Sequence, residues 1–295
     1  MPKDPSPMRR AGLFGLMAAA FTPLLQACSP LRIINALAPA STYTRSSDQV
    51  YGTHARQKID VYQPNPPVAN APVVVFFYGG SWTTGDRADY LFAGEALASR
   101  GIVTLIADYR LSPEVRYPVF VQDSALAVKW AHDNAKRFGG DPDRLFVMGH
   151  SAGGYNAAMV ALDPRWLGAV GMRPAQLAGF IGIAGAYDFL PIAIPDVKVA
   201  FNWPNTPPDS QPLFHASKAA PRTLLLAARN DTLVNPVRNT DGLAKKLRDA
   251  GVPVQTEILD GVSHVTIIGS LAKPLRLLAP VLDRVAEFVK PDKAA

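Results

Sequence analysis

Cysteine is almost missing from this sequence, since Cys28 is the only one among 295 residues. A fold stapled by disulfide bonds is therefore excluded. Charged residues are also scarce, at 18%, whereas hydrophobic residues make up 48%. An intrinsically disordered chain would have the opposite balance and is excluded as well. No run of 18 or more apolar residues occurs beyond the first thirty positions, which excludes a protein that crosses a membrane several times.

The chain also lacks a cluster of basic residues. Its formal net charge is +6, and +4 remains once residues 1–27 are set aside. No basic run in that remainder is longer than the pair Lys245 and Lys246. A nucleic-acid groove needs positive charge gathered on one face, so we do not expect nucleic acid as a partner. No histidines and carboxylates have the spacing of metal ligands, and we expect neither a metal nor a cofactor.

Residues 1–27 have the pattern of an export signal rather than of a folded segment. Two arginines, Arg9 and Arg10, precede an apolar stretch over residues 11–27. The sequence Leu-Gln-Ala-Cys that ends at Cys28 resembles a bacterial lipobox, in which the cysteine is lipidated and becomes the new N-terminus. We therefore expect an exported cell-envelope lipoprotein, facing the periplasm or in the outer membrane, tethered by a linker over residues 28–42. A plain signal peptide or an uncleaved anchor is the alternative.

From residue 43 onward, buried strands alternate with helices. Continuous apolar runs such as residues 73–78 and 102–107 are typical of strands buried on both faces of a parallel sheet. Further strands are expected over 43–50, 57–62, 145–148, 177–184, 223–228 and 254–259, and helices over 87–100, 119–138, 155–162, 237–250 and within 271–289. The alternation predicts one α/β domain over residues 43–295, with a mostly parallel central sheet and helices on both faces.

One long segment interrupts this pattern. Residues 188–221 are rich in proline and aromatic residues and lie between two expected strands. Sites of α/β proteins form at the carboxyl ends of the strands, where such a segment would begin. We therefore expect a small lid-like excursion over a site, with an ordinary surface loop as the alternative.

The clearest motif is Gly-His-Ser-Ala-Gly-Gly over residues 149–154, which contains the pattern Gly-x-Ser-x-Gly. It follows the strand expected at 145–148 and opens the next helix. On such a tight turn the hydroxyl of Ser151 is exposed above the sheet, and the small neighbouring residues let the backbone turn without clashes. A glycine-rich phosphate-binding turn is the alternative, but the lysine and the glycine spacing of such turns are missing. The motif predicts Ser151 as a nucleophile.

A serine hydroxyl needs a base to remove its proton, and that base is usually a histidine oriented by a carboxylate. His264 lies just past the last expected strand and before the last helix, in a loop that would return to the serine. The other histidines lie before the core strands, within a helix, inside the serine turn or in the irregular segment: His54, His132, His150 and His215. We predict His264 as the base.

The acid should lie between the serine and the histidine in chain order. Asp231 does so, directly after the strand expected at 223–228. Asp188 ends the preceding strand and is the main rival, whereas Asp241 falls within a predicted helix and Asp260 is very close in sequence to the histidine. We predict Asp231 as the acid that orients the base.

The reaction also needs backbone N–H groups that point at the developing oxyanion. The residue after the nucleophile, Ala152, supplies one. The others should come from the loop Tyr-Gly-Gly-Ser-Trp over residues 78–82, which follows the first buried strand. Its paired glycines let the backbone approach a substrate closely, although an ordinary turn would also use them.

Together these residues resemble the α/β-hydrolases of the esterase and lipase group that includes hormone-sensitive-lipase-like and arylformamidase-like enzymes. The resemblance covers about residues 57–289. Residues 108–114, Asp-Tyr-Arg-Leu-Ser-Pro-Glu, resemble the DYRLAPE signature of that group, and residues 139–144, Gly-Gly-Asp-Pro-Asp-Arg, resemble the GGDPxRI sequence before its nucleophile strand. The resemblance implies the α/β-hydrolase fold.

The oxyanion loop departs from the pattern of that group, which is usually HGGG or HGGxW. Tyr78 stands at the position of the histidine, and Ser81 replaces the third glycine of the HGGG form. By the resemblance, the N–H groups of Gly80, Ser81 and Ala152 would form the oxyanion hole. Because these donors are backbone groups, we expect the hole to form, with the tyrosine changing how the loop is held.

The resemblance implies a serine hydrolase that cleaves small carboxylic esters through an acyl-enzyme on Ser151, with His264 and Asp231 completing the triad. The Gly-Gly-x-Trp loop is similar to the arylformamidase form, so an arylformamidase or amidase is the alternative. A catalytically inactive binding lipoprotein on the same fold is a third possibility. The presence of all three triad residues argues against it.

Overall fold

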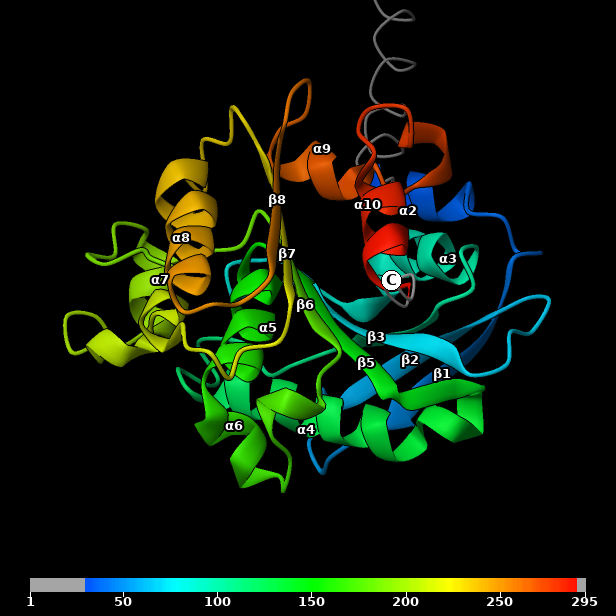
Figure 1. Ribbon diagram of the computed structural model, residues 1–295, viewed down its shortest axis with the longest axis horizontal. Coiled ribbons are helices and arrows are strands. Elements are labelled where there is room, and N and C mark those ends of the chain that lie inside the picture. The colour runs from blue at the N-terminus through cyan, green and yellow to red at the C-terminus, as the bar shows by residue number, and fades with distance from the viewer. Residues whose placement is uncertain (1–29, 291–295) are drawn as a thin grey trace, which may run out of the picture.

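The computed structural model describes residues 30–290, and an eight-stranded sheet runs through them (Figure 1). Its strands are β1 (Tyr43–Val50), β2 (Lys58–Pro64), β3 (Ala71–Phe77), β4 (Val103–Ala107), β5 (Gly140–His150), β6 (Gly179–Ile183), β7 (Thr223–Ala228) and β8 (Val254–Leu259). Their order in the sheet is β1-β2-β4-β3-β5-β6-β7-β8. The pairs β1–β2 and β2–β4 are antiparallel, and all other neighbouring strands are parallel.

The centre of the sheet is buried because its strands carry apolar side chains on both faces. Every residue of β3, β4, β6 and β7 is buried. Alternating burial would leave one face open to water, whereas this pattern requires a layer of helices on each face. The carboxyl ends of β3, β5, β7 and β8 lie at one edge of this sheet, so the loops after them meet there.

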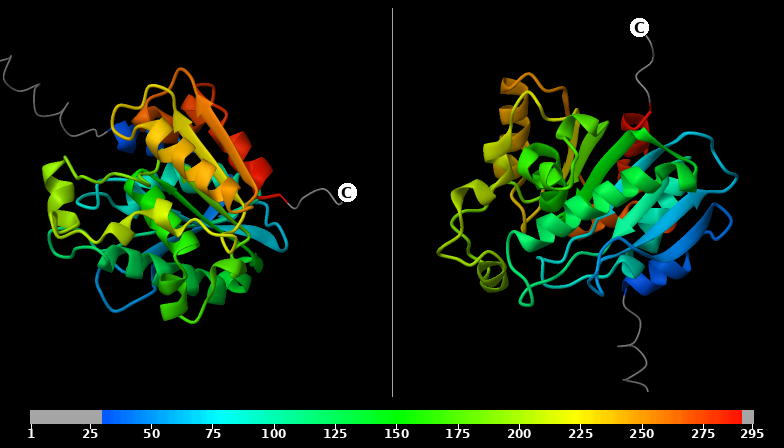
Figure 2. Two further views of the ribbon diagram at one scale, coloured as in Figure 1. Left: turned by 60° about the vertical axis from the view of Figure 1, so that its left-hand side comes forward. Right: turned by 90° about the horizontal axis from the view of Figure 1, so that it is seen from below.

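Helices form those two layers. They are α2 (Pro30–Ala36), α3 (Leu91–Ala98), α4 (Val119–Asn134), α5 (Ala152–Leu162), α6 (Pro164–Ala169), α7 (Pro195–Ala200), α8 (Gly242–Asp249), α9 (His264–Gly269) and α10 (Val281–Phe288). Helices α3 and α10 contact each other on one face of the sheet, and α4 and α5 pack together on the other (Figures 1 and 2). The α/β-hydrolase fold predicted from the sequence is confirmed.

The predicted elements are present, with differences at their ends. The strand expected at 145–148 is longer, because β5 extends over Gly140–His150 and pairs with β3 at Gly140 and again over residues 145–149. The helix expected over 237–250 begins with a wider π-type turn at Val237–Asp241 before α8. The short helices α6, α7 and α9 were not predicted, because six residues are too few to establish an apolar periodicity.

Within the linker expected over residues 28–42, residues 30–36 form α2. The side chain of Asn35 holds this helix in place: its Nδ2 donates to the carbonyl oxygens of Ala88 (3.1 Å) and Asp89 (3.0 Å), and its Oδ1 accepts from the N–H of Phe92 (3.0 Å). Phe92 lies in the first turn of α3, where a backbone N–H has no partner within the helix. The side-chain oxygen of Asn35 supplies that partner. The predicted signal segment and Cys28 lie outside the described residues.

The 188–221 segment packs onto the body of the domain. Phe201 is fully buried against the ring of Trp82, at a centroid distance of 4.7 Å. Other residues of the segment line a cavity at the carboxyl edge of the sheet, described below. Among residues 30–290, the helices are all too short or too polar to cross a membrane.

Candidate active site

Ser151 lies on the sharp turn between β5 and α5. Its backbone has φ 55° and ψ −121°, a conformation that a non-glycine residue rarely adopts. The turn is tight: a Cβ atom on Gly153 would lie 2.1 Å from the carbonyl oxygen of Phe77, and one on Gly149 would lie 2.1 Å from that of Gly153. Only glycine fits at these two positions, which explains the spacing of the motif. The turn thus holds the hydroxyl of Ser151 at the wall of a cavity.

His264 and Asp231 contact each other, although 33 residues separate them in the chain, and His264 lines the same cavity as Ser151. Nδ1 of His264 lies 2.6 Å from Oδ2 of Asp231, and both residues are buried. The other carboxylate oxygen of Asp231 accepts hydrogen bonds from the N–H groups of Leu233 (2.9 Å) and Val234 (2.8 Å). Burial alone would raise the pKa of Asp231, but these hydrogen bonds outweigh it and lower the pKa below its ordinary value. The carboxylate is therefore fixed and charged.

The rival carboxylates are engaged elsewhere. Asp188 forms an ion pair with Arg238 at 2.9 Å, and Asp260 forms one with Arg229 at 2.6 Å. Asp241 ends the π-type turn before α8. The structure therefore places the predicted acid, and none of its three rivals, against the predicted base.

Three of the other histidines also lie away from the serine. His54 pairs with Glu114, His132 contacts Asp133, and His215 contacts the backbone carbonyl of Asp209. All of these contacts are on the surface.

His150 has a role that the sequence did not reveal. Its Nε2 lies 2.9 Å from the carbonyl oxygen of His264, so this nitrogen carries the proton and donates to that oxygen. Burial lowers the pKa of His150 to about 3, with the neighbouring His264 adding to the effect. The neutral ring therefore holds the backbone at the start of α9, from which the predicted base projects. Because 114 residues separate the two histidines, no local sequence signal could have indicated the contact.

The predicted oxyanion donors lie free at the same place. Within residues 30–290, the N–H groups of Gly80, Ser81 and Ala152 donate no hydrogen bond to the protein. The loop approaches the serine closely, since a Cβ atom on Gly79 would lie 3.0 Å from Cβ of Ser151. Gly80 (φ 131°) and Ser81 (φ 52°) both have positive φ, which turns the chain so that these N–H groups are not used in the sheet.

Tyr78 holds this loop through a buried polar network. Its hydroxyl donates to Oδ1 of Asp108 (2.6 Å) and accepts from Nη2 of Arg56 (2.7 Å). Its carbonyl oxygen accepts from the hydroxyl of Tyr109 (2.8 Å), whose ring stacks on that of Tyr78. Asp108 also accepts from the backbone N–H and the guanidinium of Arg87. At the position where the group named above usually has a histidine, Tyr78 is therefore held by charged partners.

The serine, the histidine and the oxyanion loop line one cavity of about 500 Å³. Trp82, Phe189 and Val197 form part of its apolar wall. The indole of Trp82 is held by a hydrogen bond from its Nε1 to Oδ1 of Asn156 (3.0 Å) and by the surrounding aromatic rings. The 188–221 segment supplies several of the lining residues, as the prediction of an excursion over the site requires.

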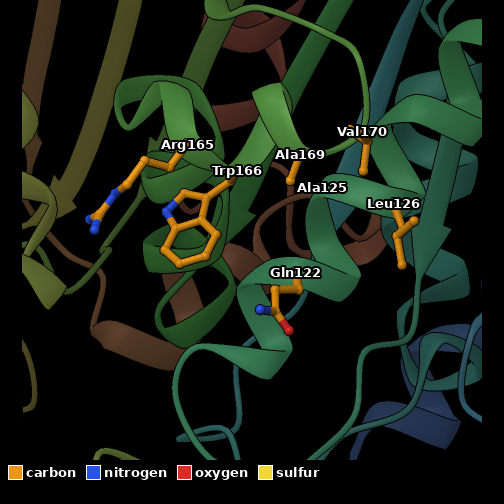
Figure 3. Close-up of a pocket in the computed structure, with 7 residues that line it drawn as sticks. All are labelled: Gln122, Ala125, Leu126, Arg165, Trp166, Ala169 and Val170. Carbon is orange, nitrogen blue, oxygen red and sulfur yellow. The ribbon is translucent and has the colours of Figure 1, made fainter.

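A smaller cavity of about 270 Å³ lies between α4 and α6, where Gln122 and Trp166 face each other (Figure 3). The described residues that line it include no serine, histidine or carboxylate. It therefore lacks the groups that the chemistry outlined above requires, and the candidate active site is the cavity at Ser151.

Two family models match overlapping parts of this chain. Residues 119–290 match the prolyl oligopeptidase family, and residues 59–167 match a family described as BD-FAE. The matched regions together contain the serine turn, the oxyanion loop and the positions of the predicted acid and base.

Curated relatives have the names of esterases. The probable isoprenylcysteine alpha-carbonyl methylesterase ICME of Oryza sativa is 26% identical over 77% of this chain and 59% of its own length. Esterase LipC of Mycobacterium tuberculosis is 29% identical over 70% of this chain and 56% of its own length. Carboxylesterase NlhH of the same species is 41% identical over 37% of this chain and 35% of its own length. The chain therefore spans between about a third and three fifths of these relatives.

Solved structures show the same fold. An esterase of the archaeon Pyrobaculum calidifontis superimposes with a TM-score of 0.72 at 23% identity, over 88% of this chain and 89% of its own. A truncated carbohydrate esterase from gut microbiota superimposes with a TM-score of 0.69 at 16% identity, over 85% of this chain and 98% of its own. From the sequence match over more than half of its length, the chain belongs to the prolyl oligopeptidase family, and its fold is that of the α/β-hydrolases.

Proposed function

We propose that this protein is a serine hydrolase that cleaves small carboxylic esters. The observation that carries the proposal is the 2.6 Å contact between His264 and Asp231, beside a serine held at φ 55° on the wall of the same cavity. Nucleophile, base and orienting acid come from three different loops at one edge of the sheet. That arrangement is the one that activates a serine hydroxyl.

The reaction follows from these positions. The hydroxyl oxygen of Ser151 attacks the acyl carbon while Nε2 of His264 takes its proton, and the charged Asp231 stabilises the imidazolium that forms. The oxyanion accepts hydrogen bonds from the free N–H groups of the 80–81 loop and of Ala152. His264 then returns the proton to the leaving alcohol, and water releases the acid from the acyl-enzyme.

The cavity favours small acyl groups. Its wall beside the serine includes Trp82, whose ring is fixed by neighbouring aromatic rings and by Asn156 and has little room to move. Phe189 and Val197 of the 188–221 segment form another part of the wall. An apolar wall of fixed size accepts a short acyl chain and hinders a long one.

The test is hydrolysis by the full chain of p-nitrophenyl acetate, butyrate, octanoate and palmitate, with N-formylkynurenine alongside. We expect the highest kcat/KM on acetate or butyrate. The Ser151→Ala variant should lose turnover and keep its thermal stability, whereas Ser47→Ala, an exposed serine on β1, should keep both. A preference for the formamide would assign the protein to the amidases instead. Activity retained by Ser151→Ala would refute the assignment of the nucleophile.

A further inference from the structure

Four large apolar side chains lie exposed on two adjoining segments far from each other in the chain. Ile33 and Leu37 belong to α2 and the residue after it, and are 51% and 56% exposed. Leu277 and Leu278 precede α10 and are 102% and 45% exposed. These four side chains are called the α2 face below. Water-exposed apolar groups that gather on one face of a protein mark a surface that contacts another apolar body.

A shared hydrogen-bond partner on α3 shows that the two segments adjoin. Glu95 accepts a hydrogen bond from the hydroxyl of Thr42 (3.0 Å) with one oxygen and from Nη2 of Arg276 (2.6 Å) with the other. Thr42 follows α2, and Arg276 directly precedes Leu277. Figure 1 shows the same arrangement, with α2 in blue beside the orange-red segment that leads to α10.

The sequence before α2 indicates what covers this face. Cys28 lies two positions before the first residue of the helix, and the mostly apolar stretch over residues 11–27 precedes it. Two residues span at most about 7 Å of extended chain. A lipid attached to Cys28, or an apolar stretch inserted in a bilayer, would therefore lie next to α2.

The structure excludes a long flexible tether between that position and the domain. The hydrogen bonds of Asn35 fasten α2 to the residues at the start of α3, and Leu31 and Ile34 pack against the core. The N-terminal attachment would thus fix the orientation of the whole domain, with the α2 face toward the lipid.

We propose that the α2 face rests on a lipid membrane, where a lipid attached to Cys28 holds it. Single acyl chains bind membranes weakly, and a second apolar contact makes the attachment stable. The side chains of the α2 face supply that second contact.

Depth-dependent quenching tests the orientation in the full chain. Leu277→Cys is labelled with bimane in membranes from a Gram-negative host, and vesicles are prepared with and without lipids that carry a nitroxide near the headgroup. The matched control is Val199→Cys, which replaces an exposed apolar residue (43%) on α7, on the opposite side of the molecule in Figure 1. The unsubstituted chain reports any label taken up by Cys28.

We expect nitroxide lipids to abolish the fluorescence of the label at position 277 and to leave that at position 199 unchanged. Equal quenching at both positions, or none at 277, would overturn the proposal. A label at 277 that is shielded from water but not quenched would show that protein covers the face, which also overturns it. Cys28→Ser should move the chain from the membrane to the soluble fraction, and unchanged fractionation would overturn the lipid attachment. None of these readouts depends on ester hydrolysis.

Discussion

Replacement of Tyr78 by phenylalanine tests how the oxyanion loop is held. The change removes one hydroxyl and leaves the ring, which keeps its stacking on Tyr109. It deletes the hydrogen bond to Asp108 at 2.6 Å and the one from Arg56 at 2.7 Å. Both partners are charged, and Asp108 is almost fully buried. The loop that follows Tyr78 carries the predicted oxyanion donors.

The expected loss of stability follows from the two lost hydrogen bonds. A hydrogen bond to a charged group contributes about 1.5–3 kcal/mol to stability. Asp108 retains the N–H and guanidinium of Arg87, and Arg56 retains the carbonyls of Gly85 and Tyr109. We therefore expect a loss of about 2–4 kcal/mol rather than the sum of two full bonds. For a domain of this size, that loss lowers Tm by roughly 4–8 °C.

Activity should fall as well, because the loop loses its fixed position. Removal of a whole oxyanion donor lowers kcat by about 10² to 10³. Displacement of a loop whose donors remain present should cost less, and we expect a roughly tenfold fall in kcat with little change in KM. The substrate is p-nitrophenyl butyrate, and Tm is measured by circular dichroism.

Tyr62→Phe is the matched control, because the hydroxyl of Tyr62 is also buried but has no hydrogen-bond partner among the described residues. Its removal should leave stability unchanged or slightly raised. If Tyr78→Phe and Tyr62→Phe behave alike in both Tm and kcat, the polar network does not hold the loop, and the reasoning is refuted.

Three further predictions concern the acid, the buried histidine and the serine turn. Asp231→Asn should lower kcat by about 10⁴, while Asp188→Asn should lower it far less; the reverse order in the p-nitrophenyl butyrate assay would exchange their roles. The pKa of His150 is lowered to about 3, so only the unfolded chain binds its proton between that pH and about 6.5. The free energy of unfolding should therefore fall by about 2 kcal/mol from pH 7 to pH 5. Measured by urea unfolding, His150→Gln should not show this fall. Gly153→Ala should lower the free energy of unfolding by more than about 3 kcal/mol, because the new Cβ would clash with backbone atoms. Gly168→Ala, with open space around it, should leave stability unchanged. Equal urea-unfolding midpoints for the two variants would contradict the packing argument.

The strands could be predicted because burial on both faces leaves a continuous apolar run in the sequence. The bounds expected for β7 and β8 agree with the structure, and each lies next to a clear turn or charged residue. The start of β5 could not be predicted, because the strand reaches back to Gly140 through the pairing of that residue with Ala71 of β3, across a register shift, and not through an apolar run. Helix α2 was missed for a similar reason, since its stability depends on Asn35 and on contacts with α3.

Local patterns in the sequence were enough to predict the α/β alternation, the serine turn and the chain order of the proposed nucleophile, acid and base. These features are local, because they depend on apolar runs, on glycines where a Cβ would clash, and on the ends of strands. Only the tertiary structure decided which carboxylate meets His264, that His150 holds the same residue from behind, and that charged groups fasten Tyr78. Each of those contacts joins residues between 22 and 114 positions apart. Residues so far apart in the chain come into contact only when the strands take their order in the sheet, and no local pattern in the chain specifies that order.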